Sequence, residues 1–268
     1  MHLKRIIAAI IALPLAYFYI SALPPVFFFA LITAVSCLGQ FEFHSMYKAD
    51  RKLSAAAIIL STLFMMLFYV STSPRSLLPG IAVASILFAI FPVSIITMRL
   101  FYRKGPEGAL SDAAPVITAF VYIPLLLLPQ WAIMLKGWQW IILLYSTVWA
   151  GDSAAFYIGT YFGKRKLCPA VSPNKTVEGA FGSVAGGIFG ALLIGSLLLN
   201  EMGAGQLIII GAVIGAVTIF GDLVESMFKR DAGVKDSGSI IPGHGGMLDK
   251  IDGSLFAGPA LYILLMVL

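Results

Sequence analysis

Long runs of apolar residues constrain this chain more than any other feature of its sequence. A helix needs about 20 apolar residues to cross a bilayer, and nine runs near that length follow one another here. They cover residues 4–21, 24–43, 53–71, 77–98, 112–129, 138–162, 177–199, 206–228 and 253–268. The breaks between them include Pro24-Pro25, Ser73-Pro74, Gly105-Pro106, Pro129-Gln130 and Asn200-Glu201. We therefore predict an all-α, polytopic membrane protein with about nine transmembrane helices.

The composition supports a membrane protein without a separate soluble domain. The 268 residues are 59% hydrophobic and 12% charged, whereas soluble domains are about 25% charged. Cys37 and Cys168 match no disulfide or zinc spacing. The charged, apolar start of the chain is compatible with a signal peptide. We interpret it as the first span, because no small-x-small cleavage site followed by a soluble domain is seen.

The placement of the basic residues predicts an orientation. With a cytoplasmic N-terminus, 16 of the 18 Lys and Arg residues fall on the cytoplasmic side, and only Arg75 and Lys136 fall outside. Cytoplasmic loops carry such an excess of Lys and Arg. This places the C-terminus outside, and it explains the net charge of +5 without a nucleic-acid partner.

Charged residues concentrate in one stretch, Asp222 to Asp252. Its 31 residues hold five Asp, one Glu, four Lys or Arg and one His. Charge near lipid is costly and persists mainly where it is paired, hydrated or functional. Because the stretch lies between two apolar segments on the predicted cytoplasmic side, we expect a reaction site at the membrane surface.

Small residues recur every four positions in three of the predicted helices. Residues 138–162 carry Ala155 and Gly159, with Gly163 just beyond; the next two helices carry Gly182, Gly186 and Gly190, and Gly211 and Gly215. Such stripes let membrane helices approach closely, within one chain or between two, so a homodimer stays open. We predict a catalytic bundle over 131–268, with cytoplasmic loops 163–178 and 229–252. Residues 1–130 form a scaffold, in which Glu42 and His44 lie near a helix end that water reaches.

Two groups of acids stand within the predicted bundle. Asp152 lies on one helix, and Asp222, Glu225 and Ser226 share a face of another at i, i+3 and i+4. Ionisable groups inside membrane segments are usually functional. We assign Asp152 and Asp222 to function and leave Glu225 open between a functional and a structural role.

Two basic loops flank these acids. In the first, Ser172-Pro173 is typical of a helix start, which would put Lys175 one turn into a helix whose amino end binds an anion. In the second, the glycines of Pro242-Gly243-His244-Gly245-Gly246 let the backbone approach a ligand closely. Asp249 and Asp252 follow at i, i+3. Together with Asp222 they offer oxygen ligands for Mg²⁺, which prefers one or two carboxylates plus substrate phosphates.

A long pattern runs through the second loop and its flanks. It consists of Ser226, Lys229, Arg230, Lys235, Asp236, Gly238, Pro242, His244, Gly245, Gly246, Asp249 and Asp252. It resembles the signature of the phosphatidate cytidylyltransferase (CDP-diacylglycerol synthase) family, of the bacterial integral membrane type. Upstream, the residues around Asp152 to Lys164 and Ser172 to Gly179 resemble the same family. One departure is Lys250, where the family usually has Arg; lysine keeps the charge but loses the bidentate fork.

The resemblance implies a Mg²⁺-dependent enzyme of the bacterial cytoplasmic membrane, with its active site on the cytoplasmic side. It would convert CTP and phosphatidic acid, a membrane lipid, to CDP-diacylglycerol and pyrophosphate. The implied catalytic residues are Asp222, Asp249, Asp152, His244, Lys229 and Arg230. The implied substrate-binding residues are Ser172, Lys175, Ser226, Lys235, Asp236, Gly245, Gly246 and Lys250. The implied Mg²⁺ ligands are Asp222, Asp249, Asp252 and Asp152, for one ion or two.

Two alternatives remain open from the residues alone. A cation-coupled transporter would place acids near mid-bilayer in repeat-related halves, whereas these acids gather near the predicted cytoplasmic edge. Another membrane lipid phosphotransferase or kinase would use a different nucleotide, and the residues do not identify the base. Identifying the nucleotide that reacts would distinguish a cytidylyltransferase from a lipid kinase or another phosphotransferase.

Overall fold

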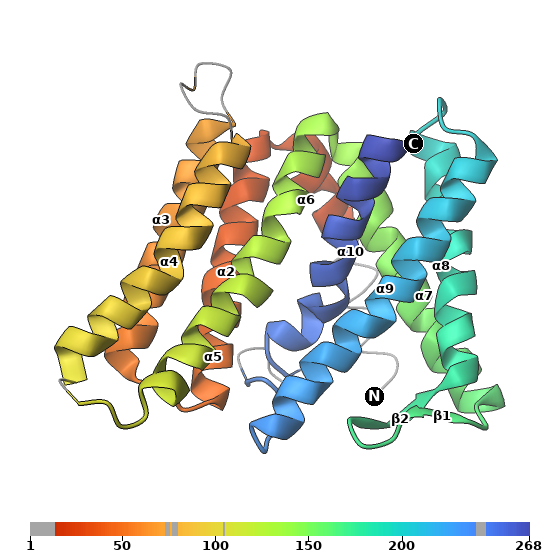
Figure 1. Cartoon of the computed structure of the whole chain (residues 1–268). Helices are drawn as coiled ribbons and strands as arrows, with labels where there is room; N and C mark the ends of the chain where they lie inside the picture. The colour runs from red at the N-terminus through yellow and green to blue at the C-terminus, as the bar shows by residue number, and fades with distance from the viewer. Residues whose placement is uncertain (1–13, 73–75, 77–79, 104, 240–244) are drawn as a thin grey trace. The chain divides into compact units, whose positions relative to one another are not determined.

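The structure is a computed structural model that describes residues 14–72, 76, 80–103, 105–239 and 245–268. The elements are α2 (Pro25–Met46), α3 (Arg51–Ser71), α4 (Gly80–Arg103), α5 (Ala109–Tyr122), α6 (Pro124–Lys136), α7 (Trp138–Phe162), β1 (Lys166–Cys168), β2 (Ser172–Thr176), α8 (Val177–Leu198), α9 (Ala204–Asp231) and α10 (Leu248–Val267). The predicted helical class is confirmed, with one short β-hairpin added to it (Figure 1).

Eight segments of the described chain are long and apolar enough to cross a membrane, so this is a multi-pass membrane protein. Seven are single helices, and the eighth, Ala109–Lys136, combines α5 and α6. They correspond to eight of the nine predicted spans. The remaining one, 4–21, falls largely outside the described residues. The orientation of the termini stays a prediction.

One predicted helix end is wrong. Residues 112–129 were expected to end at Pro129-Gln130, but α6 continues through Pro129 to Lys136, and the break lies between Tyr122 and Pro124. Pro124 has no N–H to donate, which suits the first position of a helix. Pro129 lies within α6, as prolines often do in membrane helices, where neighbouring groups satisfy the freed backbone.

The chain divides into two compact units that interleave along the sequence. The first comprises 1–31, 129–224 and 256–268, and the second comprises 32–128 and 225–255. Helices α2, α6, α9 and α10 each contribute residues to both. The predicted division into a scaffold over 1–130 and a catalytic bundle over 131–268 concerns function and stays a prediction.

In the first unit, α8 packs closely against α7 and against the first part of α9 (Figure 1). A methyl group added at Gly186 would lie 2.5 Å from the backbone oxygen of Ala150 on α7, and one at Gly215 would lie 2.5 Å from that of Ser183 on α8. Ser183 Oγ also donates a hydrogen bond to the Gly215 oxygen at 2.8 Å. The predicted close packing of the three small-residue stripes is therefore confirmed within one chain.

In the second unit, aromatic rings fill the space between α3, α4 and α5. Phe91 stacks on Phe120 with centroids 3.7 Å apart, and Phe64 meets Phe120 edge-on at 5.2 Å. Helix α3 begins at a conventional cap, because the Asp50 carboxylate accepts hydrogen bonds from the N–H groups of Lys52 and Leu53.

Arg99 closes the connection between α4 and α5. Arg99 is 3% exposed, and its guanidinium donates to Asp112 Oδ2 at 2.9 Å, to the Gly105 oxygen at 2.6 Å and to the Glu107 oxygen at 2.5 Å. Three groups in fixed directions suit the planar fork of arginine. The contacts tie residues 105–107 to the two helices that they connect.

Candidate active site

A cavity of about 600 Å³ lies in the first unit, among α7, the β-hairpin, α8 and α9. This volume falls within the range of small-molecule sites, about 300–1,000 Å³. Asp152, Ser172, Lys175, Thr176 and Asp222 are among its lining residues. Residues that the sequence assigns to catalysis and to substrate binding therefore line one space.

Lys175 and Asp222 form an ion pair across this cavity, with Nζ and Oδ2 separated by 2.5 Å. The two side chains are 21% and 40% exposed, respectively. A cation paired with a carboxylate can exchange that partner for a phosphate, because both acceptors are anionic oxygens. The cavity thus holds both a phosphate-binding group and carboxylates that can bind a cation.

The hairpin carries Lys175, and this corrects the predicted helix start at Ser172-Pro173. Ser172 to Thr176 is strand β2, paired with β1, and α8 begins at Val177. Proline disfavours the helical conformation for the residue before it, so Ser172 adopts extended backbone. Thr176 is the cap instead, and its hydroxyl accepts a hydrogen bond from Gly179 N at 3.1 Å. Lys175 therefore precedes the helix rather than lying one turn into it.

Close packing around Thr176 fixes the base of the hairpin. Methyl groups at Gly159 and Gly163 would lie 3.1 Å and 2.7 Å from Thr176 Oγ1. The Glu178 carboxylate accepts hydrogen bonds from the backbone N–H groups of Lys164 and Arg165. These contacts hold both ends of the 163–176 loop, and they explain two glycines of the predicted stripe.

The second unit holds another cluster, centred on Lys229. Its ammonium group donates to Asp249 Oδ1 at 2.6 Å and also pairs with Glu225, one turn earlier on α9. Glu225 is 1% exposed and Lys229 is 8% exposed. A buried carboxylate needs such a partner, because an uncompensated charge there is costly.

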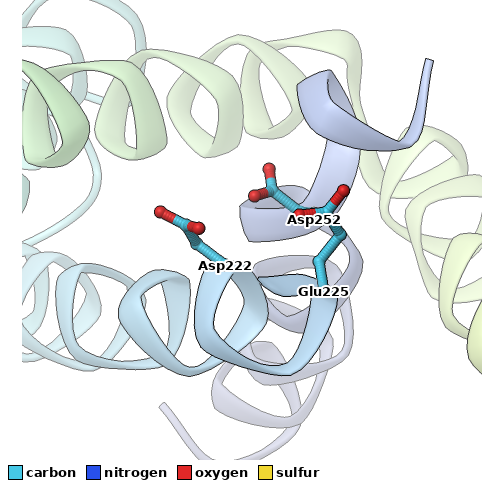
Figure 2. A group of neighbouring side chains, drawn as sticks. All are labelled: Asp222, Glu225 and Asp252. Carbon is cyan, nitrogen blue, oxygen red and sulfur yellow. The ribbon is translucent and has the colours of Figure 1, made fainter. Parts of the chain in front are cut away.

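Glu225 also lies near an acidic residue of α10, Asp252. Oxygens of these two carboxylates lie within 4.8 Å of one another, a spacing that a cation between them can bridge. Figure 2 shows Asp222 and Glu225 projecting from α9 and Asp252 from α10. The residues present therefore fit a hard divalent cation. A functional role for Glu225 stays a prediction.

Asp249, by contrast, is held by groups of the chain itself. Its Oδ2 accepts hydrogen bonds from Gly246 N at 2.8 Å, Ser237 N at 3.1 Å and Ser237 Oγ at 3.0 Å. Gly245 has φ +87°, which favours glycine, and a methyl group there would lie 2.7 Å from Asp249 Oδ2. In the structure Gly245 makes room for Asp249; the contact of Gly245 and Gly246 with a ligand stays a prediction.

Glu42 is the acid that the sequence interpretation misplaced. It was expected to lie where water reaches it, but it is 2% exposed, as is His44. Its carboxylate accepts hydrogen bonds from Ser237 Oγ, Met247 N and Leu248 N. The signal for it was present, because Glu42 is the one acidic residue of an otherwise apolar run.

The other predicted site residues are more dispersed. Ser226 is buried on α9, and Arg230 Nη1 donates to the Val234 oxygen at 3.0 Å. Lys235, Asp236 and Lys250 are exposed. His244 lies outside the described residues. Asp222 and Asp249 belong to different units, so their joint binding of a metal ion stays a prediction.

Comparison with known proteins identifies the family. The cytidylyltransferase family matches residues 3–268. A phosphatidate cytidylyltransferase of Pseudomonas aeruginosa is 34% identical over 98% of this chain and 96% of its own length. One of Synechocystis sp. is 32% identical over 100% and 98%, and one of Staphylococcus epidermidis is 36% identical over 65% and 66%. The family match extends over both units and all the described helices, and the chain belongs to the cytidylyltransferase family.

Proposed function

We propose that this chain is a phosphatidate cytidylyltransferase, which transfers the cytidylyl group of CTP to phosphatidic acid. Two relatives named for that activity match it over nearly their whole length. The single structural observation that carries the proposal is the cavity that joins Lys175 to Asp222 and Asp152. A site for two anionic reactants requires cationic groups and metal-binding carboxylates in one place.

The reaction joins two phosphates. An oxygen of the phosphatidic acid phosphate attacks the α-phosphorus of CTP, and the bond from that phosphorus to the bridging oxygen of the β-phosphate breaks. Pyrophosphate leaves with the electron pair, and no oxidation or reduction occurs. The attacking phosphate is already ionised, so the chain needs no strong general base, and positioning with charge neutralisation accounts for the catalysis.

Basic residues provide that neutralisation. Lys175 binds a phosphate in the cavity when it leaves Asp222, and Lys229 is held ready between two carboxylates. Arg230 and Lys235 lie at the exposed end of the same helix and in the loop after it. We place this end of the protein at the cytoplasmic surface, where CTP is available and where the basic loops are expected.

We infer that Mg²⁺ is held by carboxylates of α9 and α10. Glu225 and Asp252 have the required spacing, and Asp222 shares the helix face of Glu225 one turn earlier. When bound, Mg²⁺ would neutralise phosphate charge and orient the α-phosphate. Asp249 contributes chiefly by holding Lys229 and the loop before α10, because its oxygens already accept several hydrogen bonds.

Purified protein in lipid nanodiscs, supplied with Mg²⁺, phosphatidic acid and each labelled nucleotide in turn, tests the proposal. We expect pyrophosphate and CDP-diacylglycerol from CTP. Release of ADP from ATP, with no reaction of CTP, would instead indicate a lipid kinase.

Asp222→Asn should lower turnover at least about 100-fold, because the variant loses the negative charge of a carboxylate that we propose binds the cation. Asp231→Asn is the matched control: Asp231 is exposed on the same helix, bonds to Tyr47 at 2.8 Å and does not line the cavity. Near-normal turnover of folded Asp222→Asn would remove Asp222 from the site.

A further inference from the structure

We propose that Glu42 is a positioning residue, which sets the direction of the acidic side chains at the start of α10. The inference rests on the proposed function, since it concerns how metal-binding acids are held. Glu42 lies on α2, about 200 residues from its partners in sequence. All of these residues belong to the second unit.

Glu42 supplies a helix cap that the local sequence lacks. The first N–H groups of a helix have no partner within it. Here Met247 N donates to Glu42 Oε1 at 2.8 Å, and Leu248 N donates to Glu42 Oε2 at 2.9 Å. The residue before them, Gly246, has no side chain with which to cap. Asp249 reaches back to Gly246 N, as in a capping box, and Glu42 satisfies the two donors that follow.

The close approach explains two glycines of the second loop. A methyl group at Gly246 would lie 2.5 Å from Glu42 Oε2, and one at Gly238 would lie 2.7 Å from Glu42 Oε1. Ordinary contacts of this kind are 3.4–4 Å. A methyl group at Gly246 would also overlap Ser237 Oγ. Gly238 is therefore required by the Glu42 carboxylate, and Gly246 by that carboxylate together with Ser237.

Ser237 couples Glu42 to Asp249. Its hydroxyl lies 3.1 Å from Glu42 Oε2 and 3.0 Å from Asp249 Oδ2. A hydroxyl has one proton to donate, so the two carboxylates share it. A change at Glu42 therefore alters the hydrogen bonds of Asp249 directly, as well as through the backbone of α10.

The first turn of α10 transmits this position to the proposed metal ligand. Asp252 follows Asp249 at i, i+3, and its oxygens lie within 4.8 Å of those of Glu225. Asp249 in turn holds Lys229, which pairs with Glu225. Loosening the start of α10 would thus disturb both sides of the Glu225–Asp252 pair.

Glu42→Gln is the sharpest test, because the side chain keeps its shape. A glutamine has one oxygen, whereas the three donors occupy both oxygens of Glu42. An amide N–H₂ would then face a backbone or hydroxyl donor. We expect the amides of Met247 and Leu248 to exchange hydrogen faster. We also expect weaker protection by Mg²⁺ against thermal unfolding, measured without substrates. The Mg²⁺ concentration that gives half of the maximal protection should rise about 10-fold or more.

Asp50→Ala is the matched control. Asp50 is also a capping carboxylate of the second unit, with N–H donors at 2.9 and 3.1 Å, but its helix is α3. This variant should lose thermal stability. The Mg²⁺ concentration that gives half of the maximal protection should nevertheless stay within about twofold of the wild-type value. This control separates the loss of stability that follows from losing any helix cap from a change in Mg²⁺ binding by the acids of α10.

The result that overturns the inference is a folded Glu42→Gln protein with unchanged exchange at residues 247–248 and unchanged Mg²⁺ protection. If Glu42→Gln cannot be purified folded, Ser237→Ala decides, since it removes only the shared hydroxyl. Unchanged Mg²⁺ protection in that variant is equally fatal to the inference. Neither measurement uses substrates, whereas failure of wild type to release pyrophosphate from CTP would refute the proposed function instead.

Discussion

The contact between α7 and α8 can be tested with a single methyl group. Gly186 faces α7 with no space for a Cβ atom, which would lie 2.5 Å from Ala150 O and 2.6 Å from Ala154 Cβ. Both neighbours belong to a helix, and neither is the end of a flexible side chain. In Gly186→Ala the two helices must therefore separate by about 0.9 Å to restore a 3.4 Å contact.

We expect this separation to cost about 1–3 kcal/mol, as overpacking of a well-packed interior does. Alanine also favours a helix over glycine by about 1 kcal/mol, so a control with the same gain is needed. Gly205→Ala provides it: Gly205 lies on α9, and a methyl group there would meet nothing within 4 Å. The difference in unfolding free energy between the two variants then reports the packing alone.

Thermal unfolding of the detergent-solubilised protein, followed by the loss of its monodisperse chromatographic peak, measures that difference. At about 2–4 °C per kcal/mol for a chain of this size, Gly186→Ala should unfold several degrees below Gly205→Ala. Turnover should fall as well, because Asp152 on α7 and Ser183 on α8 line the same cavity. Equal midpoints for the two variants would refute the close contact of α7 with α8.

Two further changes test how the loops are held. Arg99→Lys should destabilise the protein by about 1–3 kcal/mol, since one ammonium group cannot replace three guanidinium hydrogen bonds to Asp112 and two backbone oxygens. A thermal midpoint like that of wild type would contradict this. Thr176→Val keeps the branched shape of the side chain but removes the cap of α8, which should lower the free energy of unfolding by about 1 kcal/mol. We expect faster hydrogen exchange at the Gly179 amide. An unchanged exchange rate there would show that the cap contributes little.

The sequence predicted the helices well because lipid imposes a length and a composition on each span. The boundaries failed where proline was the only guide. Pro129 was expected to end a helix and lies inside one, whereas Pro124 begins one. Proline removes a single donor in every context, and whether the helix continues depends on neighbours that the local sequence does not reveal.

The same difficulty affected Ser172-Pro173. A serine followed by proline is typical of a helix start, but pairing of Ser172 with Cys168 in a hairpin turned the segment into a strand. Lys175 nevertheless lines the cavity, as expected of a phosphate-binding residue. The residue types thus placed Lys175 beside the predicted acids Asp152 and Asp222, although the backbone that presents it was predicted wrongly.

Glu42 shows why a motif identifies its residues more reliably than their partners. The glycines of the second loop indicated that something approaches the backbone closely, and a ligand was the natural interpretation. In the structure the approaching group at Gly246 and Gly238 is a carboxylate from α2. Local spacing cannot reveal a contact between residues so distant in the chain. The available signal was an acid in an apolar span, because a buried carboxylate must find hydrogen-bond donors. The start of a helix provides such donors, since its first N–H groups have no partner within the helix.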